Sequence, residues 1–125
     1  NKMANINILT VDDSVSMRML LRAALTGAGH QIAEAEDGVA ALEWLGSNSK
    51  PDLVITDINM PRMDGFGFIE GMRANPDHKA TPVLVLTTES DAAKKQRARE
   101  AGATGWIVKP FDPAKLVDAV RRVAA

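Results

Sequence analysis

The sequence predicts an α/β domain in which a doubly wound parallel sheet of five strands is covered by helices on both faces. Five short apolar runs are each followed by a longer segment with helical spacing. The alternation is strict, and no linker, repeat or low-complexity segment interrupts it. Strands that alternate with helices form parallel sheets, because each connection crosses one face of the sheet before the next strand begins.

The first strand is expected at residues 6–11, which form a β-rich apolar run ending in an Asp-Asp pair. The helix after it begins at Ser14, a favourable N-cap residue, and closes near Gly27 or Gly29. One apolar stripe runs along this helix, made of Met17, Leu20, Leu21, Ala24, Leu25 and Ala28.

The second and third strand–helix pairs have weaker signals. Residues 31–35 form a weak strand, and the helix after the next Asp-Gly turn carries Val39, Leu42 and Leu45. The third strand is expected at residues 53–56. Residues 65–73 look helical but contain three glycines, so helix propensity alone supports this segment poorly.

The fourth and fifth pairs complete the pattern. Residues 82–87 are the clearest buried strand, and residues 90–101 form the next helix. Residues 106–108 are a short strand. Pro113 suits the first position of the last helix, whose apolar side consists of Leu116, Val117, Val120 and Val123.

Length and composition indicate one domain, which we place at residues 4–125. Asn1 and Lys2 precede Met3, so residues 1–3 resemble a remnant of the expression vector. The chain has no cysteine, which excludes disulfides and thiolate chemistry, and its formal net charge is −1. No apolar run is long enough for a spanning helix, and no signal peptide is recognisable. We therefore expect a cytoplasmic monomer that binds neither nucleic acid nor membrane.

Polar side chains follow four of the five predicted strands. The first strand ends at Asp12 and Asp13, the third at Asp57, the fourth at Thr87 and the fifth at Lys109. Ligands of such sheets bind beyond the carboxyl ends of the strands. Each residue alone has an ordinary interpretation as a cap, turn or strand-end residue, but their joint placement favours a functional site.

The residue types in this set suit phosphoryl transfer. Neighbouring carboxylates repel one another unless a cation compensates their charge, and oxygen ligands suit Mg²⁺. A carboxylate such as Asp57 can then act as the nucleophile, while Lys109 and Thr87 supply donors for the phosphoryl oxygens.

These residues lie in motifs that resemble the receiver domain of two-component response regulators over nearly the whole chain. The motifs are VDDS (11–14), EAEDGVAAL (34–42), TDINMPRMDG (56–65), TTES (87–90), AGATGWIVKP (101–110) and IVKPF (107–111). The second and fifth most resemble single-domain chemotaxis regulators. The resemblance, rather than the pattern, implies a flavodoxin-like (βα)5 fold with strand order 2-1-3-4-5.

The resemblance implies a role for each residue of the acidic site. Asp57 would be the phosphoacceptor, taking its phosphoryl group from a histidine of a CheA-like sensor histidine kinase. Asp13 and Asp57 would ligate Mg²⁺ directly, Asp12 through water, and Asn59 through its backbone carbonyl.

It also implies roles for the neighbouring residues. Thr87 and Lys109 would hold the phosphoryl oxygens, and the bond between Lys109 and Pro110 would be cis. Asn59 and Glu89 match two variable positions that tune the lifetime of the phosphate.

Two positions depart from the family pattern. Trp106 occupies a switch position that usually holds Tyr or Phe, so its larger ring would either block the inward state or favour it constitutively. Thr88 stands where many relatives carry a smaller residue, and it could narrow access to the phosphate.

The expected function is therefore a regulator that is not an enzyme but assists its own phosphotransfer and dephosphorylation. A flagellar motor switch protein would be the output partner in chemotaxis. Alternatives within the family are a phosphate sink, a relay outside chemotaxis, or a receiver cut from a longer regulator.

Two other classes fit less well. A phosphatase of the haloacid dehalogenase type would have a second Asp two residues after Asp57, where this chain has Asn59. An FMN-binding flavodoxin-like module would have a Ser/Thr/Gly-rich loop after the first strand, where Asp12 and Asp13 would repel the phosphate.

Overall fold

The computed structural model describes residues 5–124 and contains one five-stranded parallel sheet with strand order β2-β1-β3-β4-β5, which confirms the predicted fold. The strands are β1 (Asn7–Val11), β2 (Gln31–Ala35), β3 (Leu53–Thr56), β4 (Val83–Thr87) and β5 (Gly105–Val108). The suspected remnant at residues 1–3 lies outside the described residues, as do residues 4 and 125 at the ends of the predicted domain.

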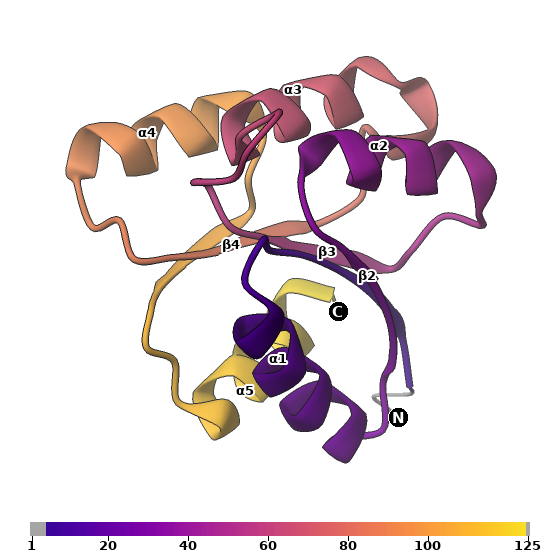
Figure 1. Cartoon of the computed structure of the whole chain (residues 1–125), viewed down its shortest axis with the longest axis vertical. Helices are drawn as coiled ribbons and strands as arrows, with labels where there is room; N and C mark the ends of the chain where they lie inside the picture. The colour runs from indigo at the N-terminus through magenta and orange to yellow at the C-terminus, as the bar shows by residue number, and fades with distance from the viewer. Residues whose placement is uncertain (1–4, 125) are drawn as a thin grey trace.

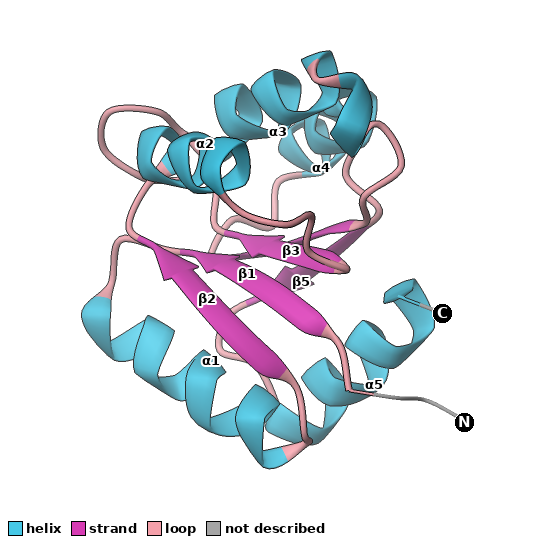
Figure 2. Cartoon of the chain, turned by 90° about the vertical axis from the view of Figure 1, so that its right-hand side faces the viewer, coloured by secondary structure: helices cyan, strands magenta, loops and turns pink. Residues whose placement is uncertain are grey.

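Helices cover both faces of the sheet (Figures 1 and 2). One face carries α1 (Val15–Gly27) and α5 (Pro113–Ala124), and the other carries α2 (Gly38–Ser47), α3 (Gly65–Ala74) and α4 (Ala92–Ala101). A short 3-10 helix at Pro76–His78 was not predicted. None of the helices in residues 5–124 is long and apolar enough to cross a membrane.

Each face of the sheet has its own hydrophobic core. The core under α1 and α5 includes Ile8, Leu25 and Leu116, while the opposite core includes Leu9 and Phe68. All five side chains are at most 1 % exposed. Burial of one such side chain contributes about 1.5–3 kcal/mol, so packing outweighs weak local propensity.

Helix α3 illustrates this balance. It forms despite its glycines because it buries Phe66, Phe68, Ile69 and Met72. A Cβ atom on Gly71 would lie 3.0 Å from Leu42 of α2, so this glycine permits close approach of the two helices.

The first helix differs from the expectation at its surface. Ser14 is its N-cap, since the Ser14 hydroxyl accepts a hydrogen bond from the Met17 amide. Leu20 and Ala28 of the predicted apolar stripe are exposed, Leu20 by 56 %. The predicted apolar stripe is wider than the surface of α1 that the sheet and α5 cover, so its outer residues remain exposed.

Candidate functional site

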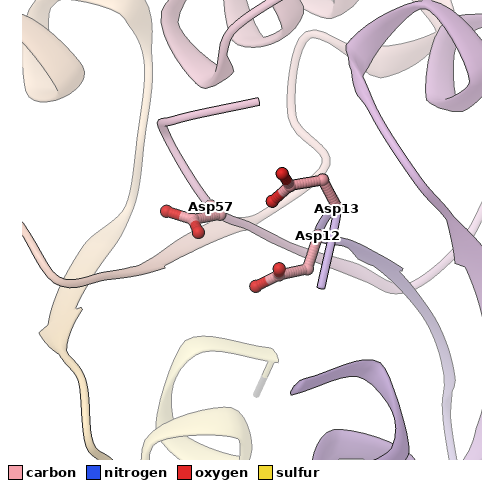
Figure 3. A group of neighbouring side chains, drawn as sticks. All are labelled: Asp12, Asp13 and Asp57. Atoms are coloured by element: carbon pink, nitrogen blue, oxygen red, sulfur yellow. The ribbon is translucent and has the colours of Figure 1, made fainter. Parts of the chain in front are cut away.

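The acidic residues meet at the carboxyl ends of two neighbouring strands. Strands β1 and β3 pair in parallel, with Val11 opposite Thr56, so the residues that follow them leave the sheet side by side. Carboxylate oxygens of Asp12, Asp13 and Asp57 lie within 4.8 Å of one another (Figure 3). The strand-end prediction for these three residues is thus confirmed in its geometry.

Lys109 joins this cluster from the end of β5. Its Nζ atom lies 2.8 Å from Oδ2 of Asp12 and 2.8 Å from Oδ2 of Asp57. The bond between Lys109 and Pro110 is cis, as expected. The Lys109 side chain is only 10 % exposed, so the ion pairs are largely shielded from water.

The protonation of Lys109 reflects two opposing influences. Burial disfavours its charged form, but the hydrogen bonds from its ammonium to Asp12 and Asp57, together with their negative charges, outweigh burial and raise the pKa of Lys109. Lys109 therefore stays charged at neutral pH. One ammonium faces three carboxylates, and a divalent cation would neutralise the remaining two negative charges.

The carboxylate of Asp57 is held at both oxygens. Its Oδ1 atom accepts a hydrogen bond from the Ile58 amide at 2.6 Å, and its Oδ2 atom accepts the bond from Lys109. The Asp57 amide donates to the carbonyl of Val11 at 2.9 Å, which ties the residue to β1. Asp57 is 8 % exposed, so its carboxylate faces the rim in a fixed orientation.

Asp12 is fixed in a similar way. Its Oδ1 atom accepts a hydrogen bond from the Ser14 amide at 2.9 Å, and its backbone amide donates to the carbonyl of Ala35 at 3.1 Å. Asp12 is 1 % exposed, whereas Asp13 is exposed. The cluster therefore has a buried floor and an open side at Asp13.

Thr87 closes β4 next to this site. It is fully buried, and its carbonyl accepts a hydrogen bond from the Lys109 amide at 2.7 Å. The Thr87 hydroxyl accepts a bond from the Glu89 amide at 3.4 Å. Thr88 is exposed.

Glu89 connects the loop after β4 to three other segments. Its carboxylate accepts hydrogen bonds from Asn59 Nδ2 at 2.9 Å and from Lys94 Nζ at 3.0 Å, and these contacts lower the pKa of Glu89. Its backbone carbonyl accepts a bond from the indole Nε1 of Trp106 at 3.1 Å. The half-buried ring of Trp106 packs against the core under α2, α3 and α4.

Sequence reasoning missed a second group beside the site. Arg62 has a positive φ of 66° and forms an ion pair with the buried carboxylate of Asp37. The PRMDG turn and the Asp-Gly turn before α2 were visible in the sequence, but nothing in either turn indicates that they pair.

A parallel doubly wound sheet with three carboxylates and a largely shielded lysine at its carboxyl edge defines the class of this protein: a small α/β domain with an acidic rim. The response regulator receiver domain family matches residues 8–121. Chemotaxis protein CheY1 of Helicobacter pylori is 40 % identical over 110 residues, which are 87 % of this chain and 89 % of the relative. The CheY homolog of Campylobacter jejuni is 38 % identical over 117 residues, covering 93 % of this chain and 90 % of the relative.

The fold comparison agrees. The structure of chemotaxis protein CheY4 of Vibrio cholerae matches with a TM-score of 0.91 and 42 % identity, covering 96 % of this chain and 99 % of the other. The chain belongs to the response regulator receiver family. It is a signalling regulator activated by phosphorylation, and not a classical enzyme.

Proposed function

We propose that this protein accepts a phosphoryl group on Asp57 from a sensor histidine kinase and changes its partner-binding face in response. The carrying observation is the fixed carboxylate of Asp57 at the end of β3, 2.8 Å from the largely shielded ammonium of Lys109. A carboxylate held in this way is preorganised for in-line attack, and positioning supplies most of the catalysis in phosphoryl transfer.

The carboxylate cluster fits Mg²⁺. Three oxygen ligands lie within 4.8 Å of one another, and they carry more negative charge than Lys109 neutralises. Asp13 and Asp57 would bind the ion directly, Asp12 through water, and Asn59 through its backbone carbonyl. When bound, the ion would neutralise charge on the phosphoryl oxygens.

The transfer needs only water as a proton source. An oxygen of Asp57 attacks phosphorus, the O–P bond forms as the P–N bond to the donor histidine breaks, and the leaving imidazole nitrogen takes up a proton from water. Lys109 then turns its ammonium from the carboxylate toward a phosphoryl oxygen. The hydroxyl of Thr87 donates to another phosphoryl oxygen. The accompanying movement of the Thr87 side chain carries the signal into the loop after β4.

Residues in the loop after β4 and next to it would control the response. Asn59 and Glu89 set the lifetime of the phosphoryl group. Thr88 narrows the access of water and of the phosphoryl donor to Asp57. Trp106, anchored to the Glu89 carbonyl at 3.1 Å, acts as the switch residue whose ring responds to movement of Thr87. In this way the protein assists both its own phosphorylation and its own dephosphorylation.

The biological setting we propose is chemotaxis, because relatives named as chemotaxis proteins match over most of the chain. Residues 4–125 would then form one receiver domain, with a CheA-like kinase as donor and a flagellar motor switch protein as target. A phosphate sink or a relay outside chemotaxis would use the same site chemistry.

Intact-mass spectrometry after incubation with acetyl phosphate tests the proposal. We expect one phosphoryl adduct that requires Mg²⁺ and is absent from Asp57→Asn. Asp52→Asn is the matched control, since Asp52 also bonds a backbone amide of the sheet but precedes β3 instead of following it. An adduct that persists in Asp57→Asn would contradict the assignment.

A further inference from the structure

The loop between β3 and α3, residues 58–64, is tied to its surroundings at several points. The Gly65 amide donates to the carbonyl of Ile58 at 2.8 Å, which closes the loop on itself. The Gly38 amide donates to the carbonyl of Met63 at 3.3 Å, so the loop also contacts the start of α2. A Cβ atom on Gly38 would lie 2.8 Å from the Met63 side chain, which shows how closely the two segments approach.

Arg62 makes the side-chain connection of this loop to the start of α2. Its Nε atom lies 2.7 Å from Oδ2 of Asp37, and its Nη2 atom lies 3.1 Å from Oδ1. This two-point geometry fixes orientation as well as distance. The Asp37 side chain is 4 % exposed, whereas the Arg62 side chain is 54 % exposed, so the arginine reaches from the surface to a buried anchor.

Asp37 is itself immobilised. Its Oδ1 atom accepts a hydrogen bond from the Ala40 amide at 2.9 Å, which makes Asp37 the N-cap of α2. The hydrogen bonds from Arg62, followed by the bond from Ala40, lower the pKa of Asp37. A capped, ionised carboxylate is a rigid partner for the guanidinium.

The backbone of Arg62 indicates that its side chain is needed at this position. Within the described residues it is the one residue other than glycine with a positive φ, 66°. Glycine or asparagine adopts this conformation more readily. For an arginine at this position, the ion pair with Asp37 offsets the free-energy cost of the positive φ.

We propose that Arg62 is a positioning residue that strengthens binding of the divalent cation by holding the loop that presents the Asn59 carbonyl. The inference rests on the proposed function, because it takes that carbonyl as a ligand. Arg62 itself does not touch the cation. Fixing one ligand in advance lowers the entropic cost of assembling the site, as outer partners of metal ligands do.

Isothermal titration calorimetry with Mg²⁺ tests this inference on the parent, Arg62→Gly and Arg62→Lys. Arg62→Gly removes the ion pair and relieves the positive φ, so the fold is retained. We expect its Mg²⁺ affinity to fall by about tenfold, the low end for an outer partner, and Arg62→Lys, which has one donor group in place of a fork, to be intermediate. The rate of labelling by acetyl phosphate should recover at saturating Mg²⁺.

Arg22→Ala is the matched control, compared with Arg62→Ala. Arg22 also pairs through Nε with a carboxylate, Glu34, and is 51 % exposed, but it lies in α1 on the other face of the sheet. Equal Mg²⁺ affinity in the parent and all three Arg62 variants, or equal losses in Arg22→Ala and Arg62→Ala, would overturn the inference. Failure of the parent to bind Mg²⁺ would overturn the proposed function, and this inference with it.

Discussion

Two loops border the acidic cluster, and they are anchored very differently. The loop after β3 is held by the Arg62–Asp37 ion pair and leads into α3, which buries five residues, Gly65, Phe66, Phe68, Ile69 and Met72. The loop after β4 leads into α4, where Ala98 is the one buried residue. Cation binding needs preorganised ligands, whereas signalling needs an element with little burial to lose. The molecule assigns these two requirements to two different loops beside Asp57.

The contacts of the second loop fit this division. Glu89 reaches Asn59, Lys94 and Trp106 through hydrogen bonds at or near the surface. Such contacts are individually weak in water. A phosphoryl group that withdraws Thr87 toward itself can therefore rearrange them, while α3 stays in place.

The largest expected effect is on the loop after β3, which the Arg62–Asp37 ion pair anchors. A Cβ atom on Gly65 would overlap the backbone carbonyl of Asp57 and lie 2.8 Å from Cα of Ile58. Gly65→Ala should therefore cost about 3 kcal/mol of unfolding free energy and abolish phosphorylation, because Asp57, the proposed phosphoacceptor, must move. Urea unfolding and intact-mass labelling measure the two effects. Gly46→Ala is the control, since a Cβ at Gly46 meets nothing within 4 Å.

A smaller effect is expected at Trp106, the proposed switch residue. Trp106→Phe removes the hydrogen bond to the Glu89 carbonyl and should lower the unfolding free energy by about 1 kcal/mol. Amide exchange in the loop after β4 should increase in the same variant. Trp44→Phe, a change of another half-buried indole in α2, should leave that loop unaffected. Equal exchange in both variants would remove the connection between Trp106 and this loop.

The ion pair of the anchored loop predicts a pH dependence. Because Arg62 lowers the pKa of Asp37 from its ordinary value of 3.8, the ionised carboxylate stabilises the folded state. That stabilisation is fully present above pH 3.8 and is lost as the pH falls through the lower folded-state value. The melting temperature of the parent should therefore fall more steeply below this pH than that of Arg62→Ala. Parallel curves would mean that the ion pair contributes nothing in solution.

The smallest effect on stability is expected for Lys94. Lys94→Ala breaks the contact to Glu89 but should leave the melting temperature nearly unchanged, because both side chains are partly exposed to solvent. The lifetime of the phosphorylated protein should nevertheless change, since Glu89 loses one of its two side-chain partners. Lys95→Ala removes the same charge one position along α4 and is the control. Identical lifetimes in both variants would restrict control of the phosphate to Asn59 and Glu89.

The sequence was sufficient to predict the acidic cluster but not the anchoring around it. Asp12, Asp13, Asp57 and Lys109 could be grouped because strict alternation implies a parallel sheet, and parallel strands end at one edge. The ion pair between Asp37 and Arg62 joins two turns that are separated by 25 positions. Its formation depends on a positive φ that no residue pattern announces, since arginine is not a residue typical of that conformation.

The predicted apolar stripes of the helices also agree only in part with the residues that the structure buries. In the predicted stripe of α5, Leu116 and Val120 are buried, whereas Val117 and Val123 are half-buried. In α1 the same rule failed for Leu20, because periodicity identifies an apolar face but not how much of it a neighbour covers. The weak burial of α4 could be expected from the sequence, because alanines are the only apolar residues in its predicted helix, residues 90–101.

Hydrogen exchange with and without phosphorylation tests the central claim most directly. With acetyl phosphate and Mg²⁺ in excess, exchange in α4 and in the loop before it should change, whereas residues 58–64 and α5 should keep their rates or gain protection. Asp57→Asn should show no change in any segment. A protein that is fully phosphorylated by mass yet unchanged in α4, or one in which residues 58–64 loosen as much as α4, would contradict the division between an anchored and a responsive loop.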